Sequence, residues 1–199
     1  MKSIKKSWIV IAIVVVIALL FYSSIKGSYN TMVSLEEGVT SQWAQVENVY
    51  QRRADLIPNL VATVKGYADF EQETLQAVIE ARSKATSINV DPGNLDPAAL
   101  QQFEAAQEQL SSALSRLLVV VERYPELKAN QNFMDLQQQL ERTENRIAVE
   151  RRKFNEDVRE YNSTIRLFPK NIYASIFGFE KKAYFEAEPG TERPPEVEF

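Results

Sequence analysis

The first apolar block of the chain is long enough to cross a membrane. Residues 8–22 read WIVIAIVVVIALLFY, and extended to Ile25 the block contains roughly 18 residues. A helix rises 1.5 Å per residue, so this block spans most of a hydrocarbon core. Trp8 and Tyr22 stand at its two ends, where amphipathic aromatic rings favour the headgroup region. We therefore predict a transmembrane helix; the alternative is a cleaved signal peptide, although no small-x-small cleavage signal follows.

Basic residues beside the block indicate its direction. Lys2, Lys5 and Lys6 precede it, whereas Lys26 stands alone behind it. Because cytoplasmic flanks carry the excess of Lys and Arg, this asymmetry predicts a cytoplasmic N-terminus. The rest of the chain is then expected on the outer side of the membrane.

Beyond the block, apolar residues recur at steps of three and four, as on one face of a helix. Gly27–Tyr29 is the single hinge candidate in front of this pattern, so we expect the helix to leave the membrane almost directly. Pro58 lacks the N–H that the helical ladder needs, and it predicts a kink or a split near residues 54–57. The apolar stripe consists of Met32, Leu35, Val39, Trp43, Val46, Tyr50, Ile57, Leu60, Val64 and Tyr67.

A second helical segment is expected from Phe70 to roughly Thr86. Asp69 can cap its N-terminus, with Gln72 at the capping-box position. Residues 89–97, NVDPGNLDP, then form the clearest loop of the chain, because Pro, Gly and Asx residues follow one another there.

A third helix is expected after this loop, with Asp96 as its cap and Pro97 in its first position. Residues 117–121, LLVVV, are apolar nearly all round, so we expect that end to be the most deeply buried. Pro125 ends the helix. The stripe is formed by Leu100, Phe103, Gln107, Leu110, Leu114, Leu117, Val121 and Tyr124.

The longest uninterrupted pattern lies in the last third of the chain, and Pro169 is expected to close or kink this helix. Residues 171–199 predict a short helix followed by an extended tail, whose Val197 and Phe199 can pack against the bundle. The pattern consists of Phe133, Leu136, Leu140, Ile147, Phe154, Val158, Tyr161, Ile165 and Phe168.

These segments predict an all-α fold, with an N-terminal transmembrane helix followed by an antiparallel bundle of about four long helices. Only 6 Gly and 8 Pro are present, so turns are few and the elements are long. The expected parts are a transmembrane anchor at residues 1–27, a helical bundle at 28–178 and an extended C-terminal tail at 179–199.

Composition narrows the chemistry. The chain contains no Cys and no His, which excludes disulfides, thiolate nucleophiles, the usual zinc sites and His general bases. A net charge of −4 gives no electrostatic footprint for nucleic acid. We therefore predict no catalytic residues, no cofactor, no metal and no small-molecule substrate.

Charged residues interrupt the apolar stripes at three places. Arg53 fills the slot between Tyr50 and Ile57, while Glu144 and Arg151 flank Ile147. Helices that bury these stripes would bring the charges together, and we predict a buried, paired network, because an unpaired buried charge costs several kcal/mol. We interpret the network as a device that fixes helix register, since it lacks a nucleophile and a proton shuttle. Further polar residues that can join it are Asp55, Asn59, Asn145 and Asn155.

Two weaker patterns favour ordinary structure. Residues 91–96 hold acids across a Gly turn without the ligand spacing of a calcium loop. Asn162 opens a glycosylation sequon, Asn-Ser-Thr, but it lies inside a predicted helix.

Several long motifs resemble the LemA family of bacterial membrane proteins. The first block is residues 43–48, WAQVEN, followed by residues 50–67, YQRRADLIPNLVATVKGY. The resemblance continues in Glu73-Thr-Leu and Glu80-Ala-Arg, and it covers the whole chain including the anchor and tail. The second block is made up of residues 124–130, Phe133, Glu144-Asn-Arg-Ile-Ala, Arg151, Phe154-Asn155 and Tyr161-Asn162.

The resemblance implies a membrane helix and an antiparallel bundle of about four helices, and it carries over no catalytic residue. Some relatives in this family are linked with membrane organisation. We predict a non-enzymatic, membrane-anchored scaffold or interaction protein that can associate with itself at the membrane. The alternatives are a regulatory accessory subunit of a membrane or envelope enzyme, and a carboxylate hydrolase of unrecognised type. The expected partners are the lipid bilayer and a protein or a second copy, and the expected place is the bacterial inner membrane, with the bundle on the periplasmic or extracellular side.

Overall fold

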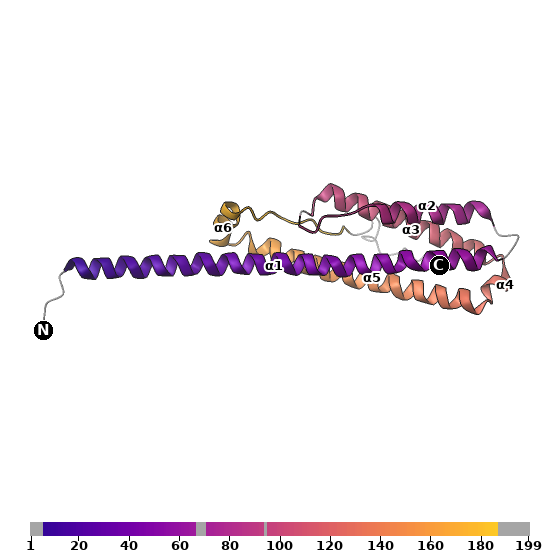
Figure 1. The fold of residues 1–199 in the computed structure, drawn as a ribbon, viewed down its shortest axis with the longest axis horizontal. Coiled ribbons are helices and arrows are strands. Elements are labelled where there is room, and N and C mark those ends of the chain that lie inside the picture. Colours follow the sequence, from indigo (N-terminus) through magenta and orange to yellow (C-terminus); the bar gives the residue numbers. More distant parts are fainter. Residues whose placement is uncertain (1–5, 67–70, 94, 187–199) are drawn as a thin grey trace, which may run out of the picture.

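The fold is seen in a computed structural model that describes residues 6–66, 71–93 and 95–186. Its longest element is α1, Lys6–Lys65, a single helix of 60 residues. Figure 1 shows it as one straight rod whose N-terminal part extends beyond the rest of the molecule. Side chains from Trp8 to Tyr22 are exposed along that projecting part. In the described part of the chain, α1 is the one helix long and apolar enough to cross a membrane.

The expectation that the helix leaves the apolar block without a hinge is confirmed, because α1 continues through Gly27–Tyr29. Of the two outcomes predicted for residues 54–57, a kink or a split, the split is wrong, since the helix also continues through Pro58. A proline at this position leaves the carbonyl four residues earlier, that of Ala54, without its backbone donor. Arg82 of the next helix replaces it, with Nε donating to the Ala54 oxygen at 2.7 Å.

Four further helices and a short turn of helix complete the described part, which contains no strand and is all-α as predicted. Besides α1, the long helices of the antiparallel bundle are α2 (Gln72–Ser87), α3 (Pro97–Val121) and α5 (Gln131–Thr164). In it, α1 packs along α5 and α2 packs along α3 (Figure 1). The short elements are α4 (Pro125–Lys128) and α6 (Lys170–Phe177).

The helix boundaries follow the capping chemistry in part. Asp96 caps α3 as expected, accepting a hydrogen bond from Ala99 N at 3.1 Å. Asp69 lies outside the described residues, and the N-cap position of α2 is Glu71, whose side chain makes no capping hydrogen bond. The long helix α5 ends at Thr164, before Pro169, because the chain turns at residues 165–169 into α6.

One expected burial is wrong. The LLVVV end of α3 is buried on one face only: Leu117, Val120 and Val121 lie in the core, but the Val119 side chain is 70% exposed. The helix has neighbours on one side there, so continuous apolarity does not make it an internal helix.

Two apolar clusters fill the bundle, one after the other along α1. The membrane-proximal cluster includes Met32, Trp43 and Tyr50, and the distal cluster begins with Ile57 and Leu60. Arg53 lies between them on α1, with its side chain 2% exposed. A polar layer around Arg53 thus separates the two apolar clusters.

Candidate functional site

The polar layer is organised by the guanidinium of Arg53, which joins α1 to two other helices. Its Nη1 donates to Ser111 Oγ on α3 at 2.8 Å and to Glu144 Oε1 on α5 at 2.5 Å. Its Nη2 donates to the side-chain and backbone oxygens of Gln107 at 2.6 and 3.3 Å. Gln107 in turn donates to Ala85 O, so the same network reaches α2. One buried cation therefore connects all four long helices.

The structure separates the three charged residues that the sequence grouped. Arg53 and Glu144 form an ion pair, but the Glu144 side chain is 44% exposed rather than buried. Arg151 is paired with Glu104 of α3 at 2.8 Å, and its Nη2 also donates to Glu186 O. The predicted network of three charges is therefore two separate ion pairs, whose members on α5 lie about two helical turns apart.

The other residues offered for the network lie elsewhere. Asp55, Asn59 and Asn145 are exposed, and Asp55 accepts a hydrogen bond from Gln51 instead. Asn155 is half-buried but binds the C-terminal segment. These three exposed residues lie one or two positions from residues of the apolar stripes. Because successive side chains on a helix are rotated by about 100° around its axis, they nevertheless point away from the core.

A cleft of about 290 Å³ opens between α3 and α5 over these pairs. Burial raises the pKa of Glu104, an effect that Arg151 opposes, and burial also raises the pKa of Tyr50 beside the Arg53 guanidinium. Two of the carboxylates that line the cleft, those of Glu144 and Glu104, are each paired with an arginine. Ser111 Oγ donates a hydrogen bond to Gln107 O. The buried Nε of Arg53 has no hydrogen-bond partner. Among the described residues that line the cleft, no hydroxyl donates to a side chain that could act as its base, as an activated nucleophile would require. Among the described residues, no three acidic side chains gather as a metal site would require.

The sequence reasoning missed the most buried carboxylate of α5, that of Glu150. Its side chain is 3% exposed and lies against Arg146 at 2.7 Å and Lys153 at 3.3 Å. Gln42 of α1 donates to Glu150 Oε2 at 2.8 Å, and this hydrogen bond holds the pKa of Glu150 below its usual value. Since α1 and α5 form the most extensive pair, Glu150 fixes their relative position nearer the membrane than Arg53 does.

The sequence reasoning also missed how the C-terminal segment is held. Residues 178–186, here called the strap, run extended along the membrane-proximal half of the bundle. Asn155 of α5 donates to Phe185 O and accepts from Phe185 N, both at 2.9 Å. Asn162, two turns later, does the same with Lys182, at 2.9 and 3.0 Å. The two amides thus satisfy the backbone N–H and C=O groups of two strap residues that have no sheet partner, Lys182 and Phe185. Asn162 of the sequon is buried and occupied by these bonds.

Side chains of the strap complete the core. The Phe185 ring stacks on Trp43 with centroids 5.8 Å apart and meets Phe154 edge-on at 5.3 Å. Lys182 Nζ binds Glu36 of α1 at 2.9 Å and donates to Gly93 O of the α2–α3 loop. The strap therefore packs on α1 and α5 beside the α2–α3 loop and the first turns of α3.

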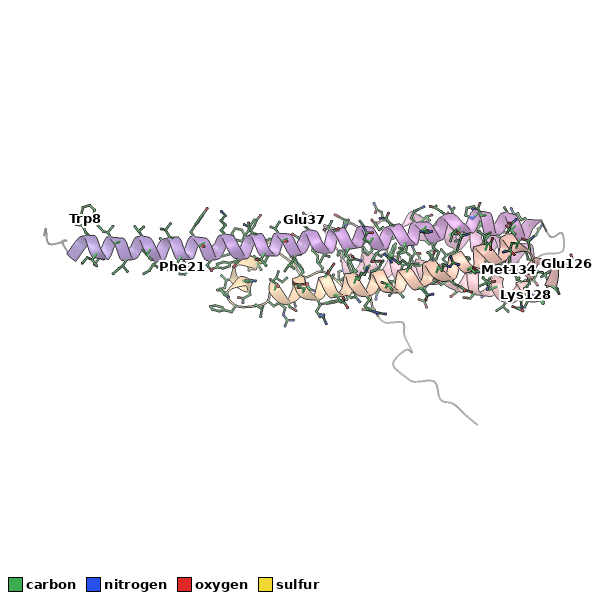
Figure 2. All side chains as sticks on the ribbon, turned by 90° about the horizontal axis from the view of Figure 1, so that it is seen from below. Trp8, Phe21, Glu37, Glu126, Lys128 and Met134 are labelled. Carbon is green, nitrogen blue, oxygen red and sulfur yellow. The ribbon has the colours of Figure 1, made fainter. Side chains whose placement is uncertain are left out.

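Figure 2 shows the full length of α1 in relation to this bundle, with Trp8 and Phe21 on the projecting part and Met134 and Lys128 at the opposite end. Trp8 and Tyr22, the predicted ends of the span, are 65% and 66% exposed. Together with the exposed aliphatic residues between them, these two aromatic residues give this part of α1 an apolar surface on all sides.

Comparisons with known proteins agree with this architecture. A magnetosome protein, MamQ 2 of Paramagnetospirillum magneticum strain AMB-1, is 27% identical over 93% of this chain and 74% of the relative. The magnetosome protein MamQ of Magnetospirillum gryphiswaldense is 25% identical over 94% of this chain and 75% of its own length. Protein LemA of Metamycoplasma hominis is 26% identical over 84% of this chain and 73% of its own length. None of these names denotes a reaction.

The family model described as LemA family matches residues 42–199, which include the Arg53 layer, Glu150 and the strap. The match begins within the bundle portion of α1 and runs to the end of the chain. With its exposed apolar helix and its matching relatives, the chain is a membrane-associated helical protein. It belongs to the LemA family.

Proposed function

We propose that this protein is a non-enzymatic scaffold or interaction protein that holds a rigid helical bundle at a membrane. The observation that carries the proposal is the continuity of α1, whose 60 residues run from the apolar span into the core of the bundle. Met32 and Trp43 of the same helix are buried among the other elements. One helix is therefore both the membrane anchor and part of the bundle core. The bundle cannot reorient freely relative to the anchor, as it could if a flexible linker joined them.

The same continuity supports a retained anchor. Ser28 and Met32 are already buried in the bundle, only a few residues beyond the span. A protease cut between span and bundle would have to open a helix that tertiary packing holds. We take the span as a signal-anchor, with the N-terminus in the cytoplasm and the bundle on the periplasmic or extracellular side, as the lysines before Trp8 favour.

The absence of native Cys makes this topology directly testable. Val119→Cys places a thiol on an exposed position of α3, and Ser3→Cys places one before the span. A membrane-impermeant maleimide is expected to label the Val119→Cys protein in intact cells with a permeable outer layer, and the Ser3→Cys protein only after lysis. The reverse pattern would place the bundle in the cytoplasm.

We propose that the bundle binds another protein or a second copy of this chain. We expect bismaleimide crosslinking of Val119→Cys and Val149→Cys proteins in native membranes to give a reproducible dimer or one recurrent partner, since both side chains are exposed and apolar. Recovery of monomer alone from both variants would refute the scaffold. Recovery of a single enzyme at fixed stoichiometry would instead assign the protein as an accessory subunit of that enzyme.

A further inference from the structure

Five large apolar side chains lie exposed together at one end of the bundle. They occupy the turn between α5 and α6 and helix α6 itself, and Phe168 and Ile176 are 81% and 69% exposed. Exposed apolar residues elsewhere in the described bundle, such as Val119 and Val149, stand singly along the sequence. Gathered apolar side chains at a surface mark a contact with something apolar. The membrane-proximal patch, as we name it, consists of Leu167, Phe168, Ile172, Ile176 and Phe177.

The position of this patch along α1 is fixed by aromatic contacts. The Tyr29 ring meets Phe177 of α6 edge-on at 5.0 Å and Phe179 at 5.7 Å. Tyr29 lies four residues beyond Ile25, the end of the apolar span, which is about 6 Å along a helix. Figure 2 shows the same relation: α6 and its turn lie between the labelled Phe21 and Glu37 along the molecule.

This position coincides with the lipid headgroups. The interfacial layer on each side of a bilayer is about 5–7 Å thick beyond the hydrocarbon core. A helix that packs on α1 about 6 Å beyond the span therefore lies at headgroup depth for any placement that buries residues 8–25 in the core. Figure 1 shows α6 at the end of the bundle that faces the projecting part of α1.

The charge of the segment suits the same environment. Residues 166–177 contain Arg166 and Lys170 and no Asp or Glu. A short helix with an apolar side and basic neighbours is the composition of elements that lie in the membrane interface, where cations meet anionic headgroups. With eight residues, α6 is too short to cross the membrane itself.

We propose that α6 and the α5–α6 turn form a second membrane contact, in which the membrane-proximal patch inserts into the headgroup–acyl boundary of the leaflet from which α1 emerges. The inference rests on the membrane anchoring stated above. A helix alone can tilt and rotate about its axis, whereas a helix with a lateral interfacial element is held in one rotational setting. The lipid surface thereby orients the bundle.

The depth of single residues tests this proposal in the full-length protein. Phe168→Cys and Ile176→Cys proteins, labelled with an environment-sensitive fluorophore, are reconstituted in vesicles of phosphatidylcholine and phosphatidylglycerol. Their matched control is Val119→Cys, an equally apolar and exposed position far from the membrane, and Ile17→Cys reports the span itself. Because all four side chains are exposed, labelling leaves the fold intact, which thermal unfolding by circular dichroism verifies.

We expect nitroxide lipids labelled near the headgroup to quench the Phe168→Cys and Ile176→Cys labels several-fold more than the Val119→Cys label, and aqueous iodide to do the opposite. If iodide reaches all three alike while Ile17→Cys is quenched only by lipid, the interfacial contact is refuted and the anchor stands. If both quenchers fail at Phe168→Cys and Ile176→Cys, protein covers the patch and the proposal is also overturned. If nitroxide lipids do not quench the Ile17→Cys label, both the proposed membrane anchor and the interfacial contact are refuted.

Discussion

A guanidinium group buried at the centre of the bundle, that of Arg53, has its carboxylate partner near the surface, on Glu144. Glu144→Ala would leave the cation in place with its bonds to Ser111 and Gln107, and water can approach the vacated side. We expect a loss of about 1–3 kcal/mol in the free energy of unfolding. Arg53→Ala removes the bonds to α3 and α5 together and is expected to cost more, about 3–5 kcal/mol. Denaturant unfolding in detergent, followed by circular dichroism, measures both.

The matched control is Glu156→Ala, an exposed glutamate of the same helix, with an expected change within about 0.5 kcal/mol. If Glu144→Ala left stability unchanged but abolished a cellular phenotype, the Arg53 layer would have to be reinterpreted as a functional site. Equal costs for Glu144→Ala and Glu156→Ala would show that the ion pair contributes nothing.

Glu150 gives the bundle a pH dependence at acidic values. The hydrogen bond from Gln42 lowers its pKa in the folded protein below the ordinary value of about 4.5. A carboxylate of this kind stabilises the fold above its unfolded pKa, and the contribution disappears as the pH falls through the lower folded pKa. We therefore expect Glu150→Gln to be less stable than the parent at pH 7 and the two melting temperatures to converge below about pH 4.5. Parallel curves from pH 3 to 7, with Glu156→Gln as control, would contradict this origin.

The residue patterns indicated inward-facing positions but not their depth or their partners. Arg53 stood out because it interrupts an apolar stripe, and its ion pair with Glu144 follows from two stripes facing each other. Arg151 was assigned to the same group because one heptad separates it from Glu144, yet its carboxylate comes from Glu104 on a third helix. Periodicity gives the face of one helix, and pairing also depends on the rotation and offset of its neighbours.

At the scale of elements, the integrity of α1 at Pro58 depends on a side chain from α2. Arg82 donates to the Ala54 carbonyl that the proline leaves free. We expect Arg82→Ala to cost about 1–3 kcal/mol in the parent chain, because a buried carbonyl loses its donor. In a Pro58→Ala background, the alanine N–H can bond the same carbonyl, so Arg82→Ala should cost less there. Unfolding free energies of the four proteins in a double-mutant cycle measure the coupling, and additive costs would refute it.

The strap can be tested through Trp43, against which Phe185 stacks. Asn155→Ala together with Asn162→Ala removes four hydrogen bonds to the strap backbone. We expect Trp43 emission to shift to longer wavelength and to become more accessible to acrylamide, measured in a Trp8→Phe background that leaves one tryptophan. Tyr184→Ala, an exposed strap residue, is the control and should leave the emission unchanged. An unshifted spectrum for the double variant would show that the strap is held without the asparagines, by aromatic packing and by its contacts with Glu36, Gly93 and Arg151.

The long helices were predictable because each carries its own stripe and breakers, as the confirmed cap at Asp96 illustrates. For residues 179–199 the sequence predicts an extended tail, but not the contacts that hold the strap, because an extended chain without a sheet partner has no periodicity that points to asparagines on α5. The same limit applies to Pro58, whose local effect is decided by a residue 24 positions away in another helix, Arg82. Contacts between elements therefore decided what local patterns left open.

At the scale of the whole molecule, continuity of α1 predicts a fixed height above the membrane. Forty residues of helix follow Ile25, which correspond to about 60 Å of rise before any tilt. A fluorophore on Val119→Cys, near the far end of α3, should therefore show little energy transfer to acceptor lipids in the bilayer surface. Insertion of a Gly-Ser-Gly-Ser segment between Lys26 and Gly27 breaks the rigid connection and should raise the transfer, because the bundle can then lean toward the lipid. Insertion of four alanines preserves the helix and serves as the control. High transfer in the parent, unchanged by the flexible insertion, would mean that the bundle lies on the membrane and that α1 does not hold it upright.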